Sequence, residues 1–387
     1  MIPLSVPNLR GNEIKYLKEC IKTEFVSSVG NYVNLFEKKI CKYTKSKYAV
    51  ACTSGTAALH LALRILNVKE NDEVIVPTMT FVATVNAVRY LNAKPIFLDC
   101  DQFFNLDTSK FLNFIRENTF FENGYTINKK TKRIIKAIIP VHVFGNACDL
   151  KNLIKVCKKK NIKVIEDAAE SLGTFYKKTK KHTETLGDIG CLSFNGNKII
   201  TSGGGGMLIT NNKKFAKKAK HLSTQAIIDP INYVHDDIGY NYRLTNIQAA
   251  VGYAQLGKIK FFIKRKKEIY EFYRKSFEDF KDISFAKVPK YSLNNKWMMS
   301  IILEKKSIYK NKKKFINFLK KKGIQVRSIW KPHHLQKPFR HYQKYQIKNA
   351  REIFKKTINI PCSTNLKISD AKKVVQIIKK FITNLQI

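Results

Sequence analysis

Apolar and polar positions alternate along this chain in two different ways. Between residues 48 and 210, short apolar runs of strand length are separated by longer stretches with helical spacing. The apolar runs are YAVAC (48–52), EVIVP (73–77), PIFLD (95–99), AIIPVHV (137–143), KVIED (163–167), GCLSF (190–194) and GMLIT (206–210). Helical patterns follow several of them, namely TAALHLALRIL (56–66), TFVATVNAVRYL (80–91) and DLKNLIKVCKKK (149–160). Strands that alternate with helices in this order predict an α/β fold, with a mostly parallel sheet flanked by helices.

The pattern changes at Thr245. From there to about residue 277 the spacing predicts one long helix, and Thr245 with Gln248 three residues later predicts a capping box at its start. The remaining elements are SFAKV (284–288), KWMMSIILE (296–304), a helix near 311–321, IQVRSIW (324–330) and a final helix from about 369 to 384. We therefore expect three parts: an N-terminal segment (1–30) near the functional site, a large α/β domain (31–250), and the long connecting helix with a smaller α+β domain (251–387).

Length and composition narrow the class of protein. A chain of 387 residues is longer than one compact core normally holds, in agreement with two domains. No apolar run is long enough to cross a membrane, and the N-terminal residues lack the apolar core and cleavage site of a secretory signal. Eight scattered cysteines without a CxxC pair predict neither a metal site nor a disulfide framework. We expect a protein of the reducing cytoplasm.

The formal charge of +43 raises the alternative of a nucleic-acid-binding protein. The 72 basic residues are 61 lysines and only 11 arginines, whereas nucleic-acid surfaces favour arginine for bidentate contacts. The lysines are spread over the chain beside many Asn and Ile residues, which indicates a bias towards A/T-rich codons. We therefore interpret them as solvated faces and predict no nucleic-acid site, although the excess charge would help to attract a polyanionic small substrate.

Two predicted strand ends carry residues suited to an anionic cofactor. The segment Thr53–Thr56 follows the strand that ends at Cys52 and leads straight into a helix. The N–H groups at such a helix start bind phosphate, although Ser-Gly-Thr is also an ordinary helix cap. Asp167 ends a buried strand, where a carboxylate is costly unless it is paired. It either caps the next helix or pairs with a cationic ring nitrogen of a cofactor.

Lys198 is set in an unusual frame, between the strand that ends at Phe194 and four consecutive glycines, 203–206. An amine in a partly desolvated pocket can act as a nucleophile or a base. The segment is neither a Walker loop nor a GxGxxG motif that opens a helix. Asn241 and Arg243 are a further polar pair just before the long helix, or ordinary residues of that loop. A phosphate site, a carboxylate for a pyridinium and a lysine for an imine together indicate pyridoxal 5'-phosphate.

The sequence resembles the DegT/DnrJ/EryC1/StrS family of sugar aminotransferases over essentially the whole chain. The resemblance rests on PTMTFVATVNAV, PVHVFGNACDL, EDAAESLG, SFNGNKIITSGGGG, GYNYRLTNIQAA and WKPHHLQKP, in the family's order. It implies fold type I of the pyridoxal-phosphate enzymes and a homodimer with active sites at the subunit interface. It also implies that Lys198 binds the cofactor as a Schiff base, that Asp167 keeps the pyridine nitrogen protonated, and that the phosphate is held by Gly55, Thr56 and Ser193.

The resemblance assigns further residues to the site. Phe81, which the pattern alone places in a helix core, would stack on the cofactor ring. Glu170 would lie near the phenolate oxygen of the cofactor, at a position that is often His or Gln in relatives. Asn241 would reach the phosphate of the cofactor in the neighbouring subunit. Trp330 and His333 match a substrate-side region, or are ordinary residues of the smaller domain.

The resemblance implies a two-stage transamination. L-Glutamate, or alternatively glutamine, gives its amino group to the cofactor, and a nucleotide-linked 4-keto-6-deoxysugar then receives it at C4. Segments 2–33 and 223–244 resemble the branch that aminates UDP-2-acetamido-4-keto-2,6-dideoxyhexose for surface sugars such as legionaminic acid. A GDP-4-keto-6-deoxymannose (perosamine-type) enzyme is the closest alternative. Dehydratases of the family carry histidine in place of Lys198, and an inactive regulatory or binding protein is the alternative from another class.

Overall fold

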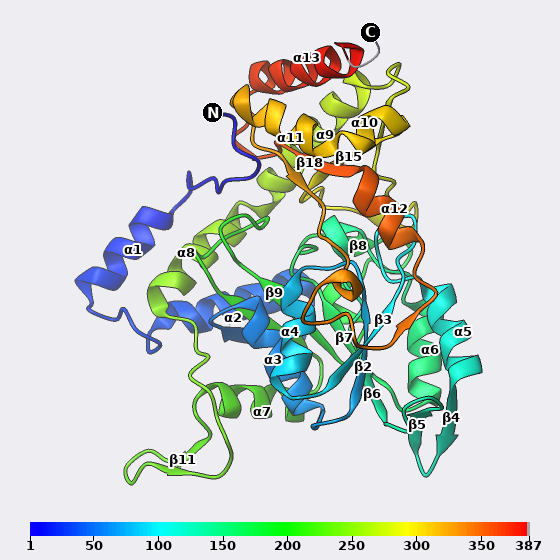
Figure 1. Ribbon diagram of the computed structural model, residues 1–387. Coiled ribbons are helices and arrows are strands. Elements are labelled where there is room, and N and C mark those ends of the chain that lie inside the picture. The colour runs from blue at the N-terminus through cyan, green and yellow to red at the C-terminus, as the bar shows by residue number, and fades with distance from the viewer. Residues whose placement is uncertain (385–387) are drawn as a thin grey trace.

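An eight-stranded sheet forms the centre of the chain in the computed structural model, which describes residues 1–384 (Figure 1). In spatial order its strands are β1 (Tyr48–Cys52), β10 (Gly206–Thr210), β9 (Ile189–Ser193), β7 (Lys163–Asp167), β6 (Ile135–Ile138), β2 (Glu73–Pro77), β3 (Lys94–Leu98) and β17 (Lys344–Tyr345). Strand β10 runs antiparallel to both neighbours, and all other adjacent pairs are parallel. The predicted mostly parallel sheet is confirmed. All seven predicted strands belong to it, whereas the two-residue strand β17 gave no pattern in the sequence.

Helices cover both faces of this sheet. One face packs against α3 (Gly55–Ile65), α4 (Val82–Tyr90) and α7 (Lys213–Ser223), and the other against α5 (Thr108–Asn118) and α6 (Lys151–Lys159). Within β2, Val74 and Val76 belong to the first core and Ile75 to the second, because successive side chains of a strand point to opposite faces. Burial on both faces explains why the strands appear in the sequence as continuous apolar runs.

The predicted single long helix after Thr245 is wrong, because the chain forms two helices. These are α8 (Asn246–Gly257) and α9 (Ile259–Ser276). Lys258 between them has φ −103° and ψ 3°, and its N–H still bonds back to α8. A glycine at the last position of α8 weakens the helix there, so the chain changes direction towards the C-terminal part. The predicted capping box of Thr245 and Gln248 is confirmed.

A second, antiparallel sheet forms the core of the C-terminal part. Its order is β13 (Ile283–Phe285), β15 (Met299–Leu303), β18 (Thr357–Ile360) and β16 (Arg327–Ser328). Helices α10 (Lys306–Lys310), α11 (Lys312–Lys321), α12 (Asn349–Lys356) and α13 (Ile368–Asn384) accompany this sheet. Figure 1 shows them above the large sheet, with α9 leading up to them. The exact division of the chain at residues 30 and 250 stays a prediction.

The N-terminal segment lies against this C-terminal part before it reaches α1 (Glu13–Lys22) and α2 (Asn31–Thr44). The carbonyl of Leu4 accepts the N–H of Cys362, and Val6 donates its N–H to the Ser363 hydroxyl. Three two-stranded pairs complete the described elements: β4 (Thr119–Glu122) with β5 (Tyr125–Asn128), β8 (Phe175–Tyr176) with β14 (Ser292–Leu293), and β11 (Ile227–Asp229) with β12 (Val234–His235). Figure 1 shows the β11–β12 pair at the end of an arm that projects from the body.

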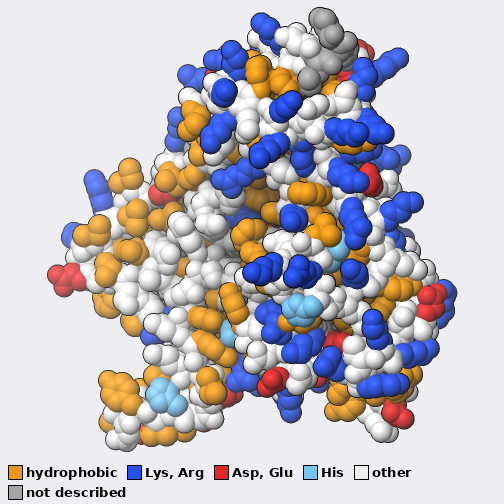
Figure 2. Space-filling model, in the orientation of Figure 1, with side chains coloured by type: hydrophobic (Ala, Val, Ile, Leu, Met, Phe, Trp, Pro, Cys, Tyr) orange, Lys and Arg blue, Asp and Glu red, His pale blue; other side chains and the backbone are white. Residues whose placement is uncertain are grey.

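The surface agrees with the interpretation of the lysines as solvated. In Figure 2 the basic side chains are scattered over the face in view, with hydrophobic and neutral groups between them. Within residues 1–384, no helix has both the length and the apolar character that a membrane span requires.

Candidate active site

A cavity of about 570 Å³ opens at the carboxyl edge of the large sheet, where open α/β sheets place their ligands. Its walls come from the turns after β1, β2, β6, β7 and β9, closed by residues of the second sheet. Eight of the ten predicted site residues line it: Gly55, Thr56, Phe81, Asp167, Glu170, Ser193, Lys198 and Trp330. Residues that lie up to 275 positions apart in the sequence therefore meet in one cavity.

The turn after β1 forms one end of this cavity. Ser54 is the N-cap of α3 and accepts the N–H of Ala57, so the predicted helix cap exists at this residue. Gly55 is required by close packing, because a Cβ atom there would lie 2.9 Å from Cβ of Ser193. The start of α3 can thus approach the end of β9, and Thr56 and Ser193 line the same cavity. A helix start with two hydroxyl groups is a suitable cradle for a phosphate.

Asp167 ends β7 and is 5% exposed. Its Oδ2 accepts the Thr84 hydroxyl at 2.7 Å, and its Oδ1 accepts the N–H of Ala169 at 3.2 Å. Burial raises the pKa of Asp167, and the Thr84 hydrogen bond and the charge of Lys198 oppose the rise. Turns follow β7 instead of a helix, so the alternative role of Asp167 as a helix cap is not what the structure shows. A carboxylate held in place at the cavity wall suits a cationic ring nitrogen.

A layer of buried polar residues holds the end of β7 from behind. His142 accepts the N–H of Cys148 at Nδ1, so its Nε2 carries the proton and donates to Glu166 at 3.0 Å. The other carboxylate oxygen of Glu166 accepts the N–H groups of Leu186 and Gly187, each at 2.6 Å. These contacts fix the strand immediately before Asp167.

Lys198 reaches into the cavity from the loop after β9, and its side chain is 12% exposed. Its Nζ lies 3.4 Å from Oε1 of Glu170 and 4.3 Å from the centroid of the Trp297 ring. The second oxygen of Glu170 accepts the N–H of Phe144 at 2.9 Å. Burial raises the pKa of Glu170 to about 7, despite the nearby cation. Glu170 can therefore hold or release a proton beside Lys198 near neutral pH.

Phe81 and Trp330 lie at the mouth of the cavity. Phe81 is the N-cap residue of α4 and is 54% exposed, so the pattern-based expectation of a helix-core residue is wrong. The ring of Trp330 lies 6.5 Å from that of Phe81 and 5.0 Å from that of Phe144, between centroids. An exposed aromatic ring beside the cavity has room to stack on a planar ligand.

His333 and Asn241 do not line the cavity of this chain. His333 is 1% exposed; its Nε2 donates to the carbonyl of Thr80 and its Nδ1 is bonded to the Gln336 amide. Burial lowers the pKa of His333 to about 4, so the ring is neutral and its contacts keep it behind the wall. The predicted role of His333 on the substrate side stays a prediction. Asn241 is exposed outside the cavity, and its contact with a second subunit stays a prediction.

The sequence patterns missed several residues of the wall. Trp297 contacts Lys198 and donates its indole N–H to the carbonyl of Asn197 at 2.6 Å. Phe144 has a φ of 54°, and Arg327 brings a cation to the wall from β16. Trp297 belongs to the apolar run 296–304 and Phe144 directly follows the run 137–143, so no local signal separated them from core residues. Arg327 interrupts the run 324–330, and that interruption was the available signal.

Comparison with known proteins agrees with this geometry. A model of the DegT/DnrJ/EryC1/StrS aminotransferase family matches residues 7–379. The chain is 37% identical to a GDP-perosamine synthase of Escherichia coli O157:H7 over 381 residues, which is 98% of each chain. It is 32% identical to a UDP-4-amino-4,6-dideoxy-N-acetyl-beta-L-altrosamine transaminase of Campylobacter jejuni serotype O:23/36 over 380 residues, which is 97% of this chain and 96% of the relative. A solved DegT DnrJ EryC1 StrS aminotransferase from Brucella abortus has a TM-score of 0.86 at 25% identity, over 96% of this chain and 95% of that one. Aminotransferases of the matched family use pyridoxal 5'-phosphate.

Proposed function

Because the chain belongs to the DegT/DnrJ/EryC1/StrS aminotransferase family, we propose that it transfers an amino group to C4 of a nucleotide-linked 4-keto-6-deoxysugar. The predicted class, a pyridoxal-phosphate-dependent nucleotide-sugar aminotransferase, is confirmed. The observation that carries the proposal is the convergence of Lys198, Asp167 and the Gly55–Ser193 contact in one cavity.

The residues of the wall fit the cofactor. Thr56, Ser193 and the start of α3 would hold its phosphate, Phe81 would cover its ring, and Asp167 would hold the proton of the ring nitrogen. When bound, the cofactor withdraws electrons from the α-carbon of the amino donor, which makes that carbon acidic. Nζ of Lys198 would hold the cofactor covalently and, once released, would move the proton at that carbon. The neighbouring Glu170 would exchange a proton with this amine.

The sugar is the finer part of the proposal. Similarity to the GDP-perosamine synthase at 37% identity supports GDP-4-keto-6-deoxymannose as the first candidate. Similarity to the Campylobacter transaminase at 32% identity, together with the opening segment 2–33, supports UDP-2-acetamido-4-keto-2,6-dideoxyhexose as the second. The sequence patterns favoured the UDP sugar. Because identity to the GDP-perosamine synthase is higher, we place the GDP sugar first. The proposed amino donor is L-glutamate, and Arg327 brings a cation to the wall that suits an anionic group of either substrate.

The active unit of the proposal is a homodimer. The projecting arm of β11 and β12 exposes Ile228, Ile231 and Tyr233 at 58%, 85% and 75%, which is unusual for apolar side chains of a monomer. Asn241 follows the arm and would reach the cofactor phosphate of the second subunit. Sedimentation of the protein would test the assembly.

A substrate panel tests the proposed function. Cofactor-loaded protein is mixed with L-glutamate and, separately, with the GDP-, UDP- and dTDP-linked 4-ketosugars, and release of 2-oxoglutarate is followed. We expect the highest kcat/KM with the GDP sugar. Highest turnover with the UDP sugar would reverse the order of the two candidates, and turnover with none of the three would contradict the proposal. Lys198→Ala is the control for background transamination.

A further inference from the structure

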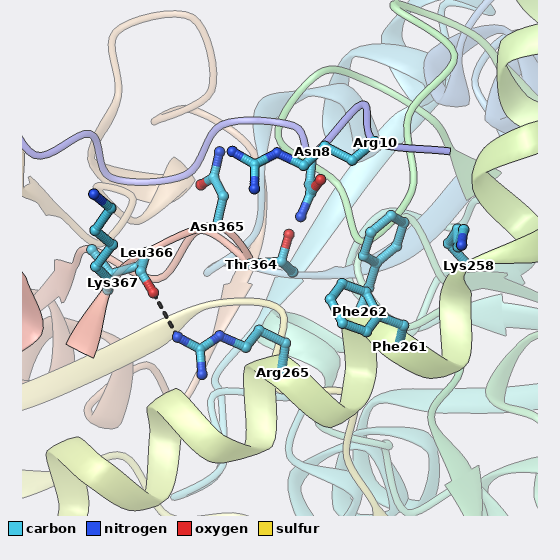
Figure 3. A pocket seen from close by; sticks show the side chains of 10 residues that line it. All are labelled: Asn8, Arg10, Lys258, Phe261, Phe262, Arg265, Thr364, Asn365, Leu366 and Lys367. Atoms are coloured by element: carbon cyan, nitrogen blue, oxygen red, sulfur yellow. Dashed lines mark hydrogen bonds between the residues drawn. The ribbon is translucent and has the colours of Figure 1, made fainter. Parts of the chain in front are cut away.

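A second cavity, of about 330 Å³, lies at the junction of α8 and α9, away from the carboxyl edge of the large sheet (Figure 3). Three segments build it. Lys258, Phe261, Phe262 and Arg265 have the spacing i, i+3, i+4, i+7 of one helix face. Asn8 and Arg10 come from the N-terminal segment, and residues 364–367 from the loop after β18. Figure 3 shows the side chains of Arg10, Lys258 and Arg265 arranged around the space.

The charge of this cavity is one-sided. Four of its ten lining residues are cations, namely Arg10, Lys258, Arg265 and Lys367, and none is acidic. Among residues 1–384, Arg10, Lys258 and Lys367 have no ion pair or side-chain hydrogen bond. Arg265 is fixed in place, because it donates to the carbonyl of Leu366 at 2.7 Å and pairs with Glu268 at 2.9 Å. One carboxylate against four cations leaves an excess of three positive charges.

A buried polar group without a partner points to a ligand in the same cavity. Asn8 is 8% exposed, and its Oδ1 makes no hydrogen bond within the described residues. In Figure 3 its amide points into the space beside Thr364 and Phe262. A buried acceptor without a partner is costly, so a ligand that brings a donor, such as a hydroxyl group, would satisfy this oxygen. Glu13, the next carboxylate along the chain, is engaged by the N–H of Gly11 and the amide of Gln255, and does not line the cavity.

The second cavity is separate from the candidate active site. Asn8, Phe262 and Thr364 also line a small gap that leads to Lys198, but this gap holds only about 10 Å³. That space is no larger than one water molecule needs, so a ligand in the second cavity cannot contact Lys198.

We propose that this basic cavity is a second binding site, for a small phosphate-bearing metabolite with at least two negative charges. Two arginines and two lysines match phosphate oxygens, the Asn8 amide offers a donor and an acceptor, and Phe261, 55% exposed, offers a ring face to an organic group. The proposal is independent of the sugar on which the enzyme acts.

Calorimetry with pyrophosphate tests the site. The cofactor-loaded protein is used, so that the phosphate cradle at Gly55 is already filled, at about 0.15 M salt to screen diffuse attraction. We expect saturable binding of one pyrophosphate per chain. The double variant Arg10→Gln, Lys258→Gln should weaken it about tenfold or more, because two charge-assisted contacts are lost. The matched variant Lys260→Gln, Lys264→Gln removes the same charge from exposed positions of α9 outside the cavity and should change the affinity less than twofold.

Three results would overturn the proposal. Absence of saturable binding would exclude the site. If both double variants weaken pyrophosphate binding equally, or if neither weakens it, the binding belongs to diffuse charge or to another cavity. Citrate that binds as tightly as pyrophosphate would exclude selectivity for phosphate. None of these results depends on turnover, so they are distinguishable from a failure of the substrate panel.

Discussion

Two lysines, one partly buried and one buried, contact the same tryptophan from two regions of the molecule, and their surroundings differ. Lys198, in the loop after β9, faces the ring of Trp297 and the carboxyl group of Glu170, and it lines a cavity of about 570 Å³. Lys266, on α9, is 3% exposed and donates to the carbonyls of Trp297 and Cys362 at 2.8 and 2.6 Å. It has no carboxylate partner among residues 1–384.

The difference separates the lysine that we propose as reactive from a structural one. The three donors of the Lys266 ammonium have three acceptors, since Sγ of Cys362 lies 3.5 Å away in addition to the two carbonyls. The Lys198 ammonium has one hydrogen-bond acceptor, at 3.4 Å, and its remaining donors face the cavity. In a chain with 61 lysines, burial alone therefore does not identify the functional one. The lysine proposed as functional differs in having unused hydrogen-bonding capacity beside an open cavity.

Removal of the Lys198 amine tests one side of this comparison. Lys198→Ala should lower turnover by about 10⁴-fold or more, because the chain then lacks both the covalent attachment and the proton carrier. Borohydride should fix the cofactor to the wild-type protein, as a mass increase on the peptide of Lys198, and should fix none to the variant. Lys264→Ala, at an exposed position of α9, is the control and should keep both properties. Borohydride labelling of Lys266 in place of Lys198 would invert the comparison.

The carboxylate of Asp167 tests whether the cavity tunes the chemistry as proposed. Asp167→Asn keeps an acceptor for the N–H of Ala169 but cannot hold a ring proton by charge. We expect kcat to fall about 10²- to 10³-fold, with a shifted absorbance of the bound cofactor. Thr84→Val removes the hydrogen bond to Oδ2, together with the contact between the Thr84 and Thr80 hydroxyls, and should cost about tenfold or less. Equal losses in the two variants would mean that position, not charge, is what Asp167 supplies.

Glu170, the carboxyl group beside Lys198, should make the stability of the protein depend on pH. Burial raises its pKa to about 7, whereas an unfolded glutamate ionises near 4.5. Between these values the folded state holds one proton more than the unfolded state. The stabilising contribution is therefore complete below pH 4.5 and is lost as the pH rises through 7. One pKa unit corresponds to about 1.4 kcal/mol. The free energy of unfolding of the cofactor-free wild type should therefore fall by about 3 kcal/mol relative to that of Glu170→Gln between pH 4.5 and pH 7. A constant difference between the two proteins from pH 4.5 to 7.5 would contradict the expected titration of Glu170.

The sequence predicted the strands and the central residues of the cavity because each carries a local signal. Continuous apolar runs marked the strands, and Lys198 and Asp167 stand next to strand ends. Trp297 was missed because its contact with Lys198 joins positions 99 residues apart, and an apolar run around it predicts only a strand. The break at Lys258 was missed because isolated glycines inside a long amphipathic pattern, here Gly252 and Gly257, are tolerated in many helices. His333 was placed in the substrate region by resemblance. In the structure it is buried, bonded to Thr80 and Gln336, and absent from the cavity wall, so its role stays a prediction.

The structural lysine gives the smallest and most selective prediction. Lys266→Met keeps a side chain of similar length but removes the ammonium donor of the carbonyls of Trp297 and Cys362. It also removes the desolvation cost of a buried cation. Unmet backbone acceptors cost about 1 to 3 kcal/mol each, so we expect a net loss of about 2 kcal/mol in the free energy of unfolding, measured by urea titration. Lys267→Met, at the exposed neighbouring position, should change it by less than about 0.5 kcal/mol. Covalent attachment of the cofactor to Lys198 should survive in both variants, because neither alters the loop after β9. Lys266→Met could instead lose the covalent attachment of the cofactor while its stability stays unchanged. That result would show that α9 takes part in the chemistry through the backbone of Trp297. The distinction between the two lysines would then fail.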